Sequence, residues 1–346
     1  MRVVLGMSGG VDSAVSAVLL KEKGYEVIGV TFRFIDDFDD SDAKKLAKML
    51  NIEHHTLDYR KEFKENVIND FLNKYKNGIT PNPCVNCNRN AKMKYMYQAM
   101  KDFNCDCFAT GHYAEYEDGM LVRAEDLNKD QSYFLSCVDK EILDHVIFPL
   151  NKLSKLEVRK IAEEKNLIVA NKKDSFDVCF IKGSFSDFIK ENLNVNEGNI
   201  VDVETKEIIG KHLGLMNYTI GQRKNIGISG NAKRHYVCGK DSETNTLYVA
   251  FGDDSSYLLS DEALITNVNF ISSKRPLNAS AKFRYRSENI DVLIDYIDDN
   301  TIRVKYVDGK AITPGQTCSV YLDNECICGG TIKQIFKDGK EIWYLR

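Results

Sequence analysis

Apolar and polar positions alternate along the first third of the chain in two different rhythms. Short apolar runs typical of buried strands are separated by segments with an apolar residue at every third or fourth position, which is the spacing of a helix. The strand-like runs are Val3 to Leu5, Glu26 to Phe34 and Cys107 to Thr110, and the helix-like segments are Val11 to Lys23, Asp42 to Leu50 and about Glu62 to Tyr75. Strands that alternate with helices build a parallel sheet. We therefore predict an α/β domain over residues 1–193, with a doubly wound, Rossmann-like parallel sheet.

The pattern changes after about Leu193. Residues 198–240 hold seven glycines, and short alternating segments such as Leu247 to Phe251 and Ile302 to Tyr306 replace the helical spacing. The strand-like segments at the end of the chain are separated by turn signals at Asp308-Gly309, Gly329-Gly330 and Asp338-Gly339. This spacing is typical of a small barrel. We expect a small α+β central domain over residues 194–257 and a C-terminal β-barrel over residues 258–346.

Composition limits the classes of function that the chain can have. The 346 residues are 43% apolar and carry a net charge of only −4, so a surface that binds nucleic acid must be a local patch. No window reaches the roughly 18 apolar residues of a membrane-spanning helix, and the first residues lack a secretory pattern. We expect a cytoplasmic protein without a membrane partner. Ten cysteines in such a chain indicate catalysis or metal binding before disulfides.

The strongest motif is Ser8-Gly9-Gly10-Val11-Asp12-Ser13, which stands where the first strand should end and the first helix begin. Freed backbone N–H groups, two hydroxyls and a helix N-terminus form a cradle suited to pyrophosphate. Asp12 would repel phosphate unless a divalent cation lies between them, so it predicts Mg²⁺. The motif is not a Walker loop, because Gly-Lys-Ser/Thr is absent from it. An ordinary glycine turn is the alternative interpretation.

These six residues resemble the signature of the ATP pyrophosphatase superfamily, the PP-loop enzymes. The resemblance implies a domain of the Rossmann-like HUP class that uses ATP to adenylate an oxygen and releases pyrophosphate, after which a nucleophile displaces AMP. It also implies which residues contact ATP, with Phe32 on the adenine side. The implied contacts are Gly6, Met7, Ser8, Gly9, Gly10, Val11, Asp12, Ser13, Phe32 and Gly111.

Two motifs that contain cysteines indicate which PP-loop family the chain resembles. They are Thr80 to Asn88 (TPNPCVNCN) and Lys173 to Ile181 (KDSFDVCFI). Together with the glycine motif they make the chain similar to the MnmA family of tRNA-specific 2-thiouridylases. Further matching stretches are Ala109 to Tyr113, Lys129 to Leu135, Tyr218 to Arg223 and Thr313 to Gln316. The resemblance implies adenylation of the C2 oxygen of the wobble uridine in the anticodon, followed by sulfur transfer that gives 2-thiouridine, AMP and pyrophosphate.

The resemblance also assigns roles to the cysteines and to partners. Cys179 would carry a persulfide sulfur and Cys87 would be the thiol that attacks or resolves it, with Asp12 as the third catalytic residue. Thiolates and persulfides are strong nucleophiles near neutral pH. The implied partners are the anticodon stem-loop of tRNAs for Lys, Glu and Gln codons, and a sulfur donor such as a cysteine desulfurase or a relay protein.

Cys84 departs from the best-known version of the family motif, which has an aspartate there. With this third thiol, Cys84, Cys87 and Cys179 could bind three irons of a [4Fe-4S] cluster and leave the fourth iron open for hydrosulfide. We hypothesise that the cluster is at least as good an explanation as the persulfide. A structural zinc site is the other alternative, but it would require a second CxxC or a His pair. The spaced pairs Cys105/Cys107 and Cys326/Cys328 are better explained as small core residues.

The resemblance implies a set of tRNA contacts that the sequence alone explains equally well as loop or surface positions. Asn82, Pro83 and Cys84 would face the target base, with prolines that help to build a rigid wall for a flipped base. Basic residues around Tyr285 suit phosphate contact and base stacking. The remaining contacts are His112, Lys129, Asp130, Gln131, Arg284, Tyr285 and Gln316. The central and C-terminal domains would then be tRNA-binding domains.

Two other classes of function remain open at this stage. A PP-loop ligase or amidotransferase that acts on a small metabolite would lack paired active-site cysteines and would need no RNA-binding appendage. A non-catalytic RNA-binding protein that keeps a relict loop would have lost Asp12 or one of the thiols. The chain keeps Asp12, Cys87 and Cys179, which favours the thiolation enzyme.

Overall fold

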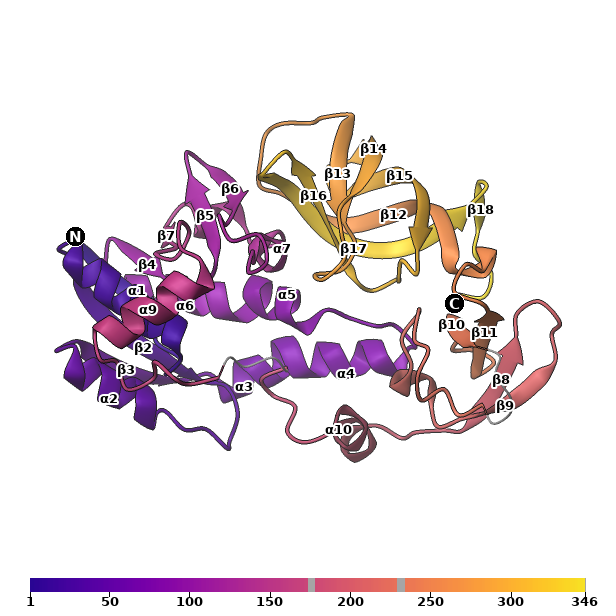
Figure 1. Ribbon diagram of the computed structural model, residues 1–346, viewed down its shortest axis with the longest axis horizontal. Coiled ribbons are helices and arrows are strands. Elements are labelled where there is room, and N and C mark those ends of the chain that lie inside the picture. The colour runs from indigo at the N-terminus through magenta and orange to yellow at the C-terminus, as the bar shows by residue number, and fades with distance from the viewer. Residues whose placement is uncertain (174–177, 229–233, 346) are drawn as a thin grey trace.

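The computed structural model describes residues 1–173, 178–228 and 234–345. Figure 1 shows a parallel-sheet domain at the amino-terminal end, a barrel built from the last third of the chain and a smaller sheet between them in sequence. Among the described residues, no helix combines the length and the apolar character that crossing a bilayer requires.

The first sheet has five strands, all parallel, in the order β3-β2-β1-β4-β7. The strands are β1 (Arg2–Gly6), β2 (Glu26–Arg33), β3 (Glu53–Asp58), β4 (Cys107–Ala109) and β7 (Val146–Ile147). The chain moves outward from β1 to β2 and β3, and later returns to the other side of β1 with β4. The carboxyl ends of β1 and β4 therefore form a topological switch point, where ligands bind in such sheets. The predicted doubly wound sheet is confirmed.

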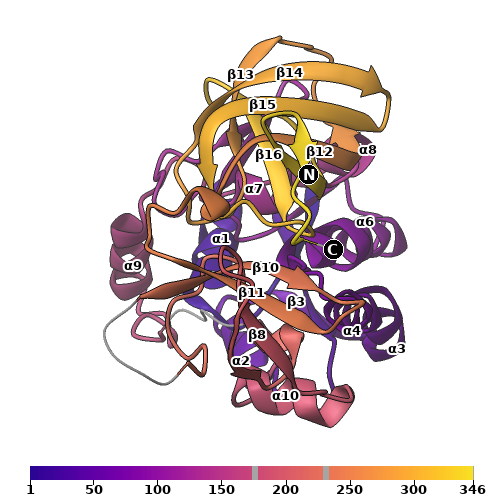
Figure 2. The same ribbon diagram turned by 90° about the vertical axis from the view of Figure 1, so that its right-hand side faces the viewer.

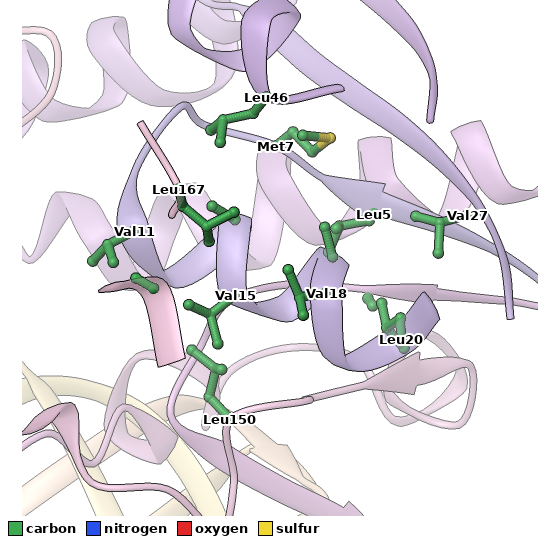
Figure 3. Close-up of a cluster of buried hydrophobic side chains, with 14 of the residues drawn as sticks. Leu5, Met7, Val11, Val15, Val18, Leu20, Val27, Leu46, Leu150 and Leu167 are labelled. Carbon is green, nitrogen blue, oxygen red and sulfur yellow. The ribbon is translucent and has the colours of Figure 1, made fainter. Parts of the chain in front are cut away.

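Helices cover both faces of this sheet, which explains why its central strand is buried. On one face, Leu5 belongs to the same buried cluster as Val15 and Val18 of α1, and Figure 3 draws these side chains within that cluster. On the other face, Val4 packs with Met93 and Met96 of α6. The helices of the first face are α1 (Val11–Glu22), α2 (Ser41–Met49) and α9 (Lys155–Glu164), and α6 (Met93–Asp102) and α8 (Lys140–Leu143) lie on the second.

Two helical stretches contain a π-helical turn each. The first runs through α3 (Arg60–Phe63), η1 (Lys64–Ile68) and α4 (Asn69–Lys76), and the second through α5 (Pro83–Cys87), η2 (Asn88–Lys92) and α6. π-helical turns occur often at functional sites. The predicted helix over about 62–75 is confirmed, although its middle turn is wider than an α-helix. The short helices α7 (Ser132–Leu135) and α10 (Phe185–Asn192) complete this part of the chain.

The middle sheet and the barrel follow. The middle sheet has the order β10-β11-β8-β9, and its β8–β11 pair is parallel. In the barrel, β12 pairs with both β15 and β17, which closes a ring of six strands and confirms the predicted barrel. The elements are β8 (Gly198–Asp202), β9 (Ile208–His212), η3 (Leu215–Asn217), β10 (His235–Asp241), β11 (Thr246–Phe251), η4 (Ser256–Leu258), β12 (Leu259–Phe270), β13 (Asn278–Lys282), β14 (Ile290–Asp298), β15 (Thr301–Lys310), β16 (Thr317–Leu322), β17 (Glu325–Lys337) and β18 (Lys340–Glu341).

A hairpin of the first domain extends the barrel sheet. The strands β5 (Ala114–Glu117) and β6 (Met120–Arg123) follow the parallel strand β4, and β6 pairs with β17 through Val122 with Glu325 and Leu121 with Cys326. Figure 2, turned by 90° from Figure 1, shows the barrel lying over the amino-terminal domain. The sequence pattern did not predict this connection between the two domains.

Two of the expected turns are instead inside strands. Asp308-Gly309 belongs to β15 and Gly329-Gly330 to β17, whereas Asp338-Gly339 does connect β17 to β18. The glycines are needed for close packing rather than for turning. A Cβ on Gly329 would lie 2.3 Å from Ser136 Oγ, and one on Gly330 would lie 2.7 Å from Ile265 Cγ2.

Candidate active site

The glycine motif forms the loop between β1 and α1, at the switch point of the parallel sheet. Gly9 has a φ of +69°, and a Cβ there would lie 3.1 Å from Asp42 Cβ and 3.2 Å from Ala43 N, so a larger residue would be strained. Gly10 caps α1 without a side-chain hydrogen bond. The N–H groups of the first helical turn therefore have no side-chain cap and suit an anion.

Two hydroxyls set the shape of this phosphate loop. Ser13 Oγ accepts from the Ser8 N–H at 3.2 Å, lies 3.3 Å from Ser8 Oγ and donates to the Gly10 carbonyl at 3.1 Å. Gly111, just beyond β4, packs against the same helix start, because a Cβ on it would be 3.1 Å from Ser13 N. The predicted ATP contacts on the loop and at Gly111 are therefore neighbours in space.

The Asp12 carboxylate already has a cation and a hydroxyl as partners. Lys155 Nζ lies 2.6 Å from Asp12 Oδ1, and the Tyr113 hydroxyl donates to the same oxygen at 2.8 Å. Lys155 is the first residue of α9, whose start is fixed by a capping box between Ser154 and Glu157. The Lys155 side chain is only 11% exposed. The loop thus has a protein cation of its own beside Asp12.

A second lysine holds the other side of the loop. Lys172 Nζ donates to the Gly9 carbonyl at 2.9 Å and to Asp42 Oδ2 at 2.7 Å. Sequence reasoning missed both lysines, since they are 143 and 163 residues away from the loop residues that they contact. Lys155 begins an ordinary amphipathic helix, so local spacing gave no signal for it.

Phe32 lies at the carboxyl end of β2, next to the strand that leads into the phosphate loop. Its ring contacts Phe34, Tyr59 and Tyr95 with centroid distances of 5.6, 5.5 and 6.0 Å. The side chain is half-buried in this aromatic cluster. Contact with adenine stays a prediction for Phe32.

Cys84 and Cys87 lie on the short helix α5, three residues apart and so on one face of it. Asn82 caps this helix, because its Oδ1 accepts from the Val85 N–H at 3.3 Å, and Pro83 occupies the first turn, where its missing N–H costs nothing. Val85 is 5% exposed and packs with the buried Tyr133 and Cys137. The helix is therefore anchored by Val85 while Cys84 is exposed and Cys87 half-buried.

Cys179 comes from far along the chain into the neighbourhood of these two thiols. Its chain neighbours Val178 and Phe180 pack in the same hydrophobic cluster as Cys87. Desolvation is the largest cause that raises the pKa of all three thiols, and it raises the pKa of Cys87 to about 12. A charge on Cys179 further raises the pKa of Cys84 and Cys87, while the Lys92 ammonium lowers the pKa of all three. At neutral pH the thiol of Cys87 is therefore protonated at rest. The residues Asp174 to Asp177, which precede Cys179 in the sequence motif, lie outside the described residues.

The metal hypotheses receive no geometric support. All ten cysteines are described and all are free. Within the described ranges, no three or more His, Cys, Asp or Glu side chains are arranged to hold a metal ion. Cys84, Cys87 and Cys179 are close enough to influence one another, and the [4Fe-4S] cluster stays a hypothesis for these three thiols. Cys107, Cys326 and Cys328 are buried core residues, as expected.

Several predicted tRNA contacts in the first domain face inward. His112 is 8% exposed, its Nδ1 lies 2.8 Å from Thr110 Oγ1, and burial lowers its pKa well below the ordinary value, so the ring is neutral. Asp130 is 4% exposed and accepts from the Ser132 N–H at 3.1 Å. Gln131 Oε1 accepts from the Tyr113 N–H at 3.0 Å. These contacts hold the loop around Tyr113, while Lys129 is half-exposed.

Predicted contacts in the barrel also have partners within the protein. Arg284 Nη2 donates to the carbonyls of Ile220 at 2.9 Å and Ala311 at 2.6 Å. Tyr285 packs on Phe134 with ring centroids 4.3 Å apart. Gln316 Nε2 donates to the carbonyls of Thr80 and Pro81. Contact with tRNA stays a prediction for Arg284, Tyr285 and Gln316, and the structure gives each of them a contact within the protein.

Family models match the chain in three consecutive parts. They are the tRNA methyl transferase HUP domain over residues 1–183, the tRNA methyl transferase PRC-barrel domain over 186–251 and the aminomethyltransferase beta-barrel domain over 260–332. Solved structures align less well. NMN synthetase from Francisella tularensis is 20% identical with a TM-score of 0.33, and the match covers 50% of this chain and 66% of that protein.

Full-length relatives are much more similar. The tRNA-specific 2-thiouridylase MnmA of Mesomycoplasma hyopneumoniae (strain 7448) is 44% identical over 369 residues, which cover 99% of this chain and 99% of the relative. The proteins of the same name from Mycoplasmopsis synoviae (strain 53) and Geobacillus thermodenitrificans (strain NG80-2) are 41% and 40% identical, and each match covers 99% of this chain and 98% of the relative. Since such identity extends over the whole length and the three family models match in order, the chain belongs to the MnmA family of tRNA-specific 2-thiouridylases.

Proposed function

We propose that this protein uses ATP to replace the C2 oxygen of the wobble uridine of tRNA with sulfur. One observation supports the proposal: Cys87 packs in one hydrophobic cluster with Phe32, at the carboxyl end of β2, and with Val178 and Phe180, the chain neighbours of Cys179. This cluster supports the inference that a nucleotide site and two thiols share one edge of the sheet. The family relationship supplies the substrate class.

The adenylation step uses the phosphate loop. The uridine O2 attacks the α-phosphorus of ATP and pyrophosphate leaves, with its charge held by the N–H groups of the first turn of α1. Lys155 keeps the Asp12 carboxylate oriented and offsets its charge near the phosphates. The oxygen donors Asp12, Ser8 and Ser13 suit Mg²⁺, which when bound would neutralise the triphosphate.

The sulfur step uses the two thiols. A sulfur donor charges Cys179 with a persulfide, whose terminal sulfur attacks C2 of the adenylated uridine, and AMP leaves with the oxygen. Cys87 as thiolate then attacks the Cys179 sulfur, which frees 2-thiouridine and leaves a disulfide between the two cysteines. A thiol reductant restores both thiols. Lys92 is the cation that favours each thiolate.

The finer assignments complete the proposal. Residues 1–193 form the catalytic domain, and residues 194–257 and 258–346 hold tRNA, with Asn82, Pro83 and Cys84 near the target base. The RNA substrates are tRNAs for Lys, Glu and Gln codons, and the sulfur comes from a cysteine desulfurase or a relay protein. The near-neutral net charge of −4 requires the RNA contacts to be local.

Mass spectrometry of nucleosides tests the function directly. Unmodified tRNA, ATP, Mg²⁺ and a sulfur source with the purified protein should yield 2-thiouridine and pyrophosphate. Cys179→Ser should still release pyrophosphate but form no 2-thiouridine, whereas Cys105→Ser, a change outside the proposed site, should leave both intact. Retained 2-thiouridine in Cys179→Ser would remove Cys179 from the reaction. A parallel iron and sulfide assay on anaerobically purified protein separates the persulfide from a cluster.

A further inference from the structure

The segment Ile79 to Pro81, directly ahead of the cysteine helix α5, is contacted by the barrel and by the middle sheet. From the barrel, Gln316 Nε2 donates to the Thr80 carbonyl at 2.7 Å and to the Pro81 carbonyl at 3.1 Å. From β10 of the middle sheet, Lys240 Nζ donates to Thr80 Oγ1 at 3.3 Å. Lys240 is 4% exposed and Thr80 is 7% exposed, so the contact lies inside the molecule. All three parts of the chain therefore meet at Thr80.

The barrel turn that carries Gln316 is shaped to this segment. Gly315 has a φ of +90°, and a Cβ there would lie 2.2 Å from Ile79 Cγ2 and 3.0 Å from the Thr80 carbonyl oxygen. The turn is fastened to the barrel, because the Gly315 N–H donates to the Ile332 carbonyl at 2.8 Å. The Gln316 amide is thus presented from a fixed support rather than from a loose loop.

The same turn is also tied to the middle part of the chain. Arg284 donates to the Ile220 carbonyl in the middle part, to the Ala311 carbonyl and to Thr313 Oγ1 ahead of Gly315. Desolvation lowers the pKa of Arg284. The guanidinium is buried and its hydrogen bonds go to acceptors within the protein. Arg284 and Lys240 therefore both tie the middle part of the chain to the rest of the molecule near Thr80.

The contact region around Thr80 and Pro81, called the junction below, directly precedes the helix that carries Cys84 and Cys87. Asn82, the next residue after Pro81, caps α5 through its Oδ1, and its Nδ2 lies 3.5 Å from the Tyr133 hydroxyl. That hydroxyl donates at 3.0 Å to the carbonyl of Thr317, the residue after Gln316. Cys84 is the second residue of α5. A shift of the barrel turn would therefore change the cap of the helix that carries both thiols.

We propose that Gln316 and Lys240 are positioning residues that fix Thr80 and Pro81, so that Asn82 caps α5 and the two cysteines keep one orientation. The hydrogen bonds themselves do not depend on the proposed function, whereas the catalytic role of the thiols rests on it. Both N–H groups of the Gln316 amide are needed for the two carbonyls, which makes this residue a clamp in the free protein.

Hydrogen exchange measured by mass spectrometry tests the clamp without any catalysis. In Gln316→Ala, amide exchange in residues 79–87 should become about fivefold to tenfold faster than in the unchanged protein, because hydrogen bonds that hold the segment are lost. Gln334→Ala is the matched control, since Gln334 is a barrel glutamine whose side chain, within the described part of the chain, donates to the exposed Glu341 carboxylate and to no other group. It should leave residues 79–87 unchanged.

Thr80→Val and Thr80→Ser test the same junction from its other side. The valine removes the acceptor of Lys240 and should speed exchange in residues 79–87 about threefold, whereas the serine keeps the hydroxyl and should restore the slow rate. Because the Thr80 variants do not alter the barrel, they still test the contact between Lys240 and Thr80 if Gln316→Ala does not fold. Equal exchange in Thr80→Val and Thr80→Ser would overturn the role of Lys240.

Measurements of kcat for thiolation and of Kd for tRNA distinguish a positioning role of Gln316 from a direct contact with RNA. For a clamp, Gln316→Ala lowers kcat for thiolation by about the same factor as it speeds exchange, while the Kd for tRNA changes by less than about twofold. A raised Kd with unchanged exchange in residues 79–87 would assign Gln316 to RNA binding and overturn the proposal. If the unchanged protein formed no 2-thiouridine, the proposed function would fail, while the exchange comparison would still decide the clamp.

Discussion

Lys155→Met should weaken the binding of Mg²⁺-ATP by about 10- to 70-fold, because it leaves the Asp12 carboxylate without its cation inside the phosphate loop. The methionine keeps the length of the side chain and removes only the ammonium. Lys155 Nζ lies 2.6 Å from Asp12 Oδ1, and among the described residues the Tyr113 hydroxyl is the remaining hydrogen-bond partner of that oxygen after the change. An uncompensated carboxylate would then face the incoming triphosphate.

The magnitude follows from the geometry and exposure of the pair. A charge-assisted hydrogen bond contributes roughly 1.5–3 kcal/mol net. The Lys155 side chain is 11% exposed and that of Asp12 is 34% exposed, so solvent screens the pair in part. We therefore take the lower part of that range, about 1.5–2.5 kcal/mol, which corresponds to a factor of about 10 to 70 in Kd.

Isothermal calorimetry of ATP binding in Mg²⁺ is the assay. Lys160→Met is the matched control, because Lys160 lies on the same helix with its side chain 75% exposed and a 3.7 Å ion pair to Glu164. Asp12→Asn and the double variant complete a mutant cycle, in which the two effects should not add because both changes remove one interaction. An unchanged Kd in Lys155→Met, or strict additivity in the cycle, would refute the reasoning.

Three further predictions concern the loop, the thiols and the junction. Gly9→Ala should cost about 1–2 kcal/mol and lower ATP affinity together with Tm, since the backbone φ is +69° and a Cβ would meet Asp42; unchanged Tm and calorimetric Kd would contradict this. Cys87, whose pKa burial raises to about 12, should react with iodoacetamide slowly at pH 8 and steadily faster toward pH 12, as mass spectrometry can follow; a rate at pH 8 like that of a model thiol would show otherwise. Tyr133→Phe should lower the free energy of unfolding by about 1–3 kcal/mol in a denaturant titration, because the buried hydroxyl donates to the Thr317 carbonyl at 3.0 Å; an unmoved midpoint would count against it.

The sequence predicted most accurately the elements that are fully buried or that are stabilised by residues close together in the chain. The run Val3 to Leu5 is fully buried and its apolar signal is unambiguous, so β1 and the following helix were found. The strand β3 was missed, because it lies at the edge of the sheet and carries half-exposed polar residues such as His54 and His55. Its strand conformation comes from pairing with β2, and the pattern of apolar and polar residues in the sequence does not reveal this pairing.

The candidate site was predictable in the same uneven way. The phosphate loop is contiguous in sequence, so its residues could be named before the structure was known. Lys155 and Lys172 contact it from more than 140 residues away, and no spacing rule reaches that far. The approach of Cys179 to Cys87 came from family resemblance, since nothing local links them. The inward contacts of Asp130 and Arg284 were missed because a loop charge is usually solvated.

The pairing of β6 with β17 has a consequence for any attempt to divide this protein into pieces. The first residues of β17, Glu325 and Cys326, have β16 on one side and the hairpin strand β6 on the other. Expressed alone, the last third of the chain would present an unpaired ladder at Cys326, and the first third would present the matching edge at Leu121. Such bare edges promote self-association. A soluble C-terminal fragment would therefore need residues 114–123 grafted beside it, or a charged substitution that blunts the edge.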